Sequence, residues 1–135
     1  MTKRPFVIIG IFVLFLAVLI PWLAFRARGD DNTGAREVPA SLQTGKELFD
    51  INCGTCHTLY AAGTDGNFGP NLDNLLAPQG QATDAATIKA TKLRVLNAIQ
   101  NGVDSSTTPG RMPAGVIGGE QATQVADFVA NEAGK

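Results

Sequence analysis

The pentapeptide at residues 53–57, with the sequence CGTCH, constrains this chain more than any other feature. Two cysteines three positions apart, followed directly by a histidine, are typical of a covalent attachment site for c-type haem. Each thiol can add to one vinyl group of the porphyrin, which holds the imidazole of His57 beside the iron, where it can serve as an axial ligand. Cys53 and Cys56 are the only cysteines of the chain, and His57 is its only histidine.

Three other interpretations of these residues stay open on the sequence alone. A thioredoxin-like redox pair would need alternating strands and helices around it, and we see no strand-rich segment. A structural zinc site would need a fourth ligand. A plain disulfide would leave His57 without a role. Covalent haem gives a role to both cysteines and to the histidine, so it is our main hypothesis.

Size and charge narrow the classes of protein. A chain of 135 residues supports one small domain with a terminal extension. Its formal net charge of −1, without any block rich in Lys or Arg, argues against nucleic acid as a partner. A domain of roughly 95 residues has a modest core by itself. A covalently held, largely apolar macrocycle would therefore supply much of the missing interior.

Residues 6–25 form a nearly unbroken apolar run behind a short basic N-terminus. A run of about 20 residues can span a bilayer as a helix, whereas the apolar region of a cleaved signal peptide typically has about 7–15 residues. Arginines crowd the candidate cleavage site at residues 27–29. We therefore predict an uncleaved membrane anchor over residues 1–28, with a cleaved signal peptide as the alternative. Basic residues flank the run on both sides, so charge alone does not set its orientation.

Residues 29–39 are polar, charged and rich in turn formers, and they show no apolar period. This composition predicts a flexible linker. Eleven such residues reach at most about 40 Å and typically span about 18 Å. The domain that follows, at residues 40–135, would then stay close to the membrane.

Apolar residues at helical spacing predict three helices in this domain. They cover residues 41–52, 85–101 and 120–132. Ser41, or a capping box formed by Thr44 and Glu47, is expected to begin the first helix. Gly102 is expected to end the second. The intervening segments are rich in small and polar residues and are predicted to be loops, at residues 58–67, 77–84 and 103–119.

Taken in order, these pieces resemble the small class I cytochromes c, here in a membrane-anchored form with one haem. The resemblance covers residues 40–135 and rests on Gly45 and Phe49 before the CGTCH motif, on the sequence GPNL at residues 69–72, and on Phe128 in the last helix. It implies an all-α fold in which three main helices surround one covalent haem c. The apolar run adds one N-terminal transmembrane helix before this fold. The resemblance also implies that Gly45 lets the first and last helices cross closely.

The resemblance assigns the remaining cofactor-binding residues. His57 would be the proximal iron ligand, and the carbonyl of Pro70 would accept its outer N–H and raise its basicity. Met112, the only methionine besides the initiator, lies in a Met-Pro pair where this family has its distal ligand. Leu72, Leu75 and Leu76 would line the haem crevice. If Met112 did not bind, five-coordinate iron would suit a gas sensor or a peroxidase-like enzyme.

Iron held by an imidazole and a thioether has no open position for a substrate, and no acid–base pair lies near the motif. We therefore expect an electron carrier without catalytic residues, and not an enzyme. The resemblance implies transfer of single electrons between respiratory or photosynthetic redox complexes. It also implies that the haem domain is on the extracytoplasmic side of the cell membrane. The alternative is a permanent subunit of a quinol-oxidising or terminal oxidase complex.

The attachment motif makes a direct prediction. Because the chain has no spare cysteine, haem staining should survive denaturing electrophoresis of the native protein. It should be lost in a variant that carries both Cys53→Ala and Cys56→Ala. Haem that extracts freely from the native chain into acidified organic solvent would contradict covalent attachment.

Overall fold

The computed structural model describes residues 4–27, 37–104 and 110–135, and within the first helix it describes the side chains of residues 12–23. The chain divides into two compact units, Met1–Thr33 and Gly34–Lys135. Most of the predicted linker at residues 29–39 lies outside the described residues. Val38, near its end, is 4% exposed and packs in the core of the second unit. The flexibility of the linker and the predicted domain boundaries stay predictions.

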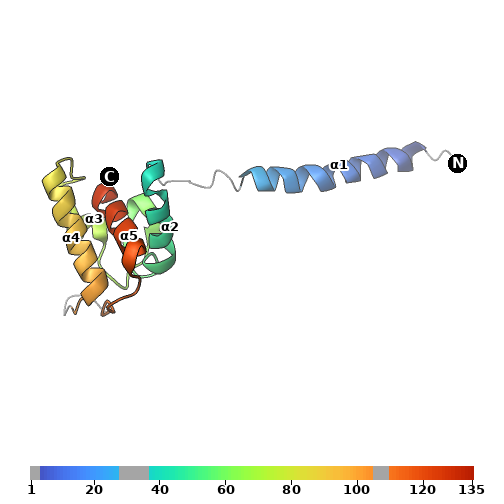
Figure 1. Cartoon of the computed structure of the whole chain (residues 1–135). Helices are drawn as coiled ribbons and strands as arrows, with labels where there is room; N and C mark the ends of the chain where they lie inside the picture. The colour runs from blue at the N-terminus through green and yellow to red at the C-terminus, as the bar shows by residue number, and fades with distance from the viewer. Residues whose placement is uncertain (1–3, 28–36, 105–109) are drawn as a thin grey trace. The chain divides into compact units, whose positions relative to one another are not determined.

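The first unit contains one long helix, α1 (Arg4–Ala27), with Pro21 inside it (Figure 1). Its 24 residues correspond to a length of about 36 Å. Most of the large apolar side chains described on it are at least half exposed: Phe12, Val13, Leu14, Phe15, Val18, Ile20, Trp22 and Leu23. Leu16 and Leu19 are partly buried. In the part of the chain that the structure describes, no helix reaches the length and hydropathy needed to cross a membrane. The transmembrane anchor stays a prediction.

The second unit is mostly helical, as expected. Its three main helices are α2 (Gln43–Asn52), α4 (Ala85–Asn101) and α5 (Gly119–Glu132). In Figure 1, α5 lies between α2 and α4, and it packs against both of them. A short helix, α3 (Leu72–Leu76), lies between α2 and α4 in the sequence. The inner face predicted for the last helix is buried, since Val125, Phe128 and Val129 are at most 1% exposed.

The limits of α4 agree with the predicted helix, with Asp84 as its N-cap and Gly102, at φ +72°, as its C-cap. The predicted start of the first helix is wrong. A 3-10 turn, η1 (Ala40–Leu42), leads directly into α2, whose N-cap is Leu42 without a side-chain hydrogen bond. The turn already satisfies the first amides, because the backbone N–H of Leu42 donates to the carbonyl of Pro39. Neither Ser41 nor the Thr44 capping box is therefore needed.

The predicted loop at residues 58–67 is in fact a folded hairpin. Two short antiparallel strands, β1 (Thr58–Leu59) and β2 (Thr64–Asp65), flank a 3-10 turn, η2 (Tyr60–Ala62). The Thr64 hydroxyl accepts the N–H of Leu59 at 3.1 Å and donates to the carbonyl of His57 at 2.9 Å. The hairpin also contributes to the core, because Leu59 is fully buried. Its small and polar composition gave no sign of this packing.

Gly45 is the point of closest approach between α2 and α5. A Cβ at this position would lie 2.3 Å from the carbonyl oxygen of Gln124 and 2.8 Å from the Cβ of Phe128. One turn further along α2, the ring of Phe49 meets that of Phe128 edge to face, with 5.9 Å between centroids. The predicted close crossing of the first and last helices is therefore confirmed.

Adding a methyl group at this crossing should destabilise the protein. The substitution Gly45→Ala gains about 1 kcal/mol of helix propensity, but it forces apart two packed backbones, and overpacking costs up to about 3 kcal/mol. We expect the free energy of unfolding to fall by about 2 kcal/mol in guanidinium denaturation of the haem-loaded protein. Thr44→Ala, at the exposed neighbouring position, is the control and should not destabilise. Equal stability of the two variants would contradict this packing role.

Candidate haem site

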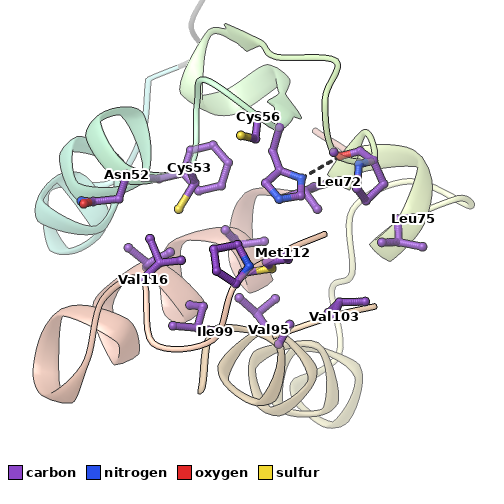
Figure 2. Close-up of a pocket in the computed structure, with 18 of the residues that line it drawn as sticks. Asn52, Cys53, Cys56, Leu72, Leu75, Val95, Ile99, Val103, Met112 and Val116 are labelled. Carbon is purple, nitrogen blue, oxygen red and sulfur yellow. Dashed lines mark hydrogen bonds between the residues drawn. The ribbon is translucent and has the colours of Figure 1, made fainter. Parts of the chain in front are cut away.

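An apolar cavity of about 690 Å³ opens between the end of α2, α3, α4 and the segment that contains Met112 (Figure 2). This volume is in the range of small-molecule and cofactor pockets. All five residues predicted to bind the cofactor line the cavity: Cys53, Cys56, His57, Pro70 and Met112. The three leucines predicted to line a crevice do so as well. Residues distant in the sequence thus meet around one apolar space.

The attachment motif forms a tight turn directly after α2. The backbone N–H of Cys53 donates to the carbonyl of Phe49 at 2.8 Å, and the N–H groups of Cys56 and His57 both donate to the carbonyl of Cys53. The hairpin then folds back against this turn, because a Cβ on Gly66 would lie 2.6 Å from the carbonyl oxygen of Gly54. The motif is therefore held by the helix on one side and by the hairpin on the other.

Neither cysteine is in a disulfide, and both thiols line the cavity. Within the described residues, no group of three or more His, Cys, Asp or Glu side chains could hold a metal ion. These observations weigh against the disulfide and zinc interpretations. Burial, together with the charge of the nearby Cys56, raises the pKa of the Cys53 thiol to about 11. Before haem is attached, the Cys53 thiol in this cavity would therefore be protonated at neutral pH.

His57 is oriented by its surroundings. Its Nδ1 lies 2.9 Å from the carbonyl oxygen of Pro70 (dashed line in Figure 2). Because a carbonyl oxygen only accepts hydrogen bonds, Nδ1 carries the proton and Nε2 keeps its lone pair. The backbone of Gly69 packs on the ring, since a Cβ there would lie 2.6 Å from Cε1 of His57. The arrangement leaves Nε2 as the atom able to bind iron.

Met112 lies on a segment that is bound to the end of α4. It forms an isolated bridge with Val103, in which each backbone N–H donates to the other carbonyl at 3.0 Å. Three residues further on, the backbone N–H of Gly115 donates a hydrogen bond to the carbonyl of Ile99 at 2.7 Å. Figure 2 shows Met112 among Val95, Ile99 and Val103. Within the predicted loop at residues 103–119, the described backbone is thus held at Met112 and at Gly115, and residues 105–109 lie outside the described part.

The residues present fit a haem. Two thiols, one imidazole with a free Nε2 and one thioether surround a cavity whose remaining lining is mainly apolar. Among the described lining residues, the charged side chains are those of Arg94 and Arg111. Their positive charge is opposite to that of the propionates at the edge of a haem, and neither has an ion pair in the described structure.

Sequence reasoning missed three residues that shape this site. Thr64 holds the carbonyl of His57, Gly69 packs on its ring, and Asp73 accepts backbone hydrogen bonds from Tyr60 and Gly134. The sequence could have indicated the role of Gly69, because a glycine often marks a place where the backbone approaches another group closely. The contacts of Thr64 and Asp73 had no local signal.

Comparison with known proteins agrees with this geometry. The family model described as cytochrome c matches residues 42–132. A search of curated proteins finds no match. The crystal structure of the c-type cytochrome SorU from Sinorhizobium meliloti is similar, with 33% sequence identity and a TM-score of 0.52. The match covers 70% of this chain and 93% of that one. The chain therefore belongs to the cytochrome c family, and its cofactor is haem c, bound covalently through Cys53 and Cys56.

Proposed function

We propose that this cytochrome is a membrane-tethered carrier of single electrons, with His57 and Met112 as the two axial ligands of its iron. The observation that carries the proposal is that the free Nε2 of His57 and the thioether of Met112 belong to one cavity with both cysteines. Two protein ligands leave six-coordinate iron without an open position for a substrate. This chemistry suits electron transfer and does not suit catalysis.

The ligand types support the same role. Bound haem iron supplies a one-electron couple, and a thioether ligand favours its ferrous form and raises the reduction potential. A thioether is neutral and needs no deprotonation to bind, unlike a lysine. Pro113 restricts the backbone of Met112 to extended geometry, and the bridge to Val103 holds it there. His57 and Met112 would be the ligands in both oxidation states, so electron transfer would need little rearrangement.

The N-terminal helix supports the tether. Side chains as large as Phe12, Phe15 and Leu14 are 58–69% exposed on α1. Burying a side chain of this size contributes about 1.5–3 kcal/mol, so a helix covered with them favours a lipid environment over water. Trp22, close to the end of the apolar run, is of the type enriched at membrane–water boundaries. Residues 1–28 are thus assigned as an anchor that stays attached.

The remaining assignments concern location and partners. Since haem is attached to this family outside the cytoplasm, the haem domain is assigned to the extracytoplasmic side of the cell membrane and the anchor is assigned a single pass. Its partners are then electron-donor and electron-acceptor redox proteins or complexes of a respiratory or photosynthetic chain. Because the tether is short, the haem domain would meet these partners by diffusion in the plane of the membrane.

The substitution Met112→Ala tests whether Met112 binds the iron and whether the protein is an electron carrier. It should still attach haem, because attachment needs only residues 53–57. It should abolish the methionine–iron charge-transfer band, lower the reduction potential, and let carbon monoxide bind the reduced iron quickly. Val116→Ala, which changes another residue lining the cavity, should keep the band. If the native protein already binds carbon monoxide readily at neutral pH, its proposed role as an electron carrier is excluded. A gas sensor or a peroxidase-like enzyme is then favoured.

Fractionation of cells tests the tether. The native protein should stay in the membrane after an alkaline wash, and mass spectrometry should find a chain that begins at or next to Met1. The double substitution Leu14→Arg and Val18→Arg should move it out of the membrane fraction, because each arginine at the centre of a span costs about 2.5–3.5 kcal/mol. Thr44→Arg in the haem domain is the control. A soluble native protein that begins near Asp30 would establish a cleaved signal peptide instead.

A further inference from the structure

Two segments lie side by side next to the imidazole, and two hydrogen bonds of equal sequence offset join them. The first bond connects Nδ1 of His57 to the carbonyl of Pro70 at 2.9 Å. In the second, the backbone N–H of Tyr60 donates to Oδ2 of Asp73, also at 2.9 Å. Each bond spans 13 residues. The segments 57–60 and 70–73 therefore cannot slip past one another without breaking both bonds.

The Asp73 carboxylate makes a second hydrogen bond. Its other carboxylate oxygen, Oδ1, accepts the backbone N–H of Gly134 at 2.8 Å, from a residue 61 positions away. Asp73 belongs to α3, which has only five residues. A helix this short is not stable by itself and depends on contacts with the rest of the fold. Hydrogen bonds to an ionised carboxylate are stronger than those between neutral groups, so these two bonds are well suited to fix the segment that begins at Pro70.

We propose that Asp73 is a positioning residue that sets the reduction potential of the haem iron by holding the Pro70 carbonyl against His57. This inference rests on the proposed function, in which Nε2 of His57 binds the iron. A firm bond to Nδ1 makes the imidazole a more basic ligand and so favours ferric iron. The packing of Gly69 on the ring transmits any displacement of this segment to the imidazole.

Two variants of Asp73 separate the hydrogen bonds from the charge. Asp73→Ala removes both acceptors, whereas Asp73→Asn removes the same charge but keeps one acceptor oxygen. In haem-loaded Asp73→Ala, the Nδ1 proton of His57 should exchange with solvent about tenfold faster than in the native protein, as measured by NMR. Its reduction potential should also rise above that of Asp73→Asn. Asp65→Asn, a loss of charge at an exposed residue of the hairpin that contains Tyr60, should leave the exchange unchanged.

The outcomes are distinct. Faster exchange of the Nδ1 proton together with a higher potential in Asp73→Ala than in Asp73→Asn supports the positioning role. Equal potentials in the two variants, or an exchange rate like that of the native protein, would overturn it, even if both variants were less stable. The methionine–iron band of the native protein is recorded first. Its absence would refute Met112 as a ligand and not the role of Asp73 at His57, which the exchange rates test separately.

Discussion

The contact between α2 and α5 at Gly45 is the constraint on which the rest of the haem domain depends. Without a Cβ at this position, the two helices approach until the backbone of one touches the other, and the rings of Phe49 and Phe128 meet edge to face. The direction of α2 is then fixed, and so is the place where it ends. Cys53 follows its last residue directly, so a contact in the core determines where the attachment motif begins.

The cavity is a continuation of this core and not a hollow added to its surface. Phe49, Ile99, Val125 and Val129 are buried in the core and also line the cavity. A haem bound there completes an apolar interior that the protein leaves unfinished. The same contacts that stabilise the fold would thereby exclude water from the iron. Backbone hydrogen bonds hold the attachment motif and the segment that contains Met112, so the side chains that these segments contribute to the cavity have fixed positions.

The sequence was most informative where the signal is local. Two cysteines and a histidine at close spacing identify the cofactor, and apolar periodicity locates α4 and the buried face of α5. Prediction failed where hydrogen bonds that leave no periodic pattern in the sequence decide the conformation. The 3-10 turn before α2 replaced the expected caps, and residues 58–67 fold as a hairpin because Thr64 bonds to the chain around it. The contact of Asp73 with Gly134 joins residues 61 positions apart, and no pattern near either residue indicates it.

The burial of Cys53 has a consequence for how the protein is assembled. Thiolates are much stronger nucleophiles than thiols, and with a pKa of about 11 this group stays protonated at neutral pH once the cavity has formed around it. In the folded chain, the Cys53 thiol would therefore react slowly with a vinyl group of haem. We expect both thioether bonds to form while the chain is still open, and the helices to close afterwards.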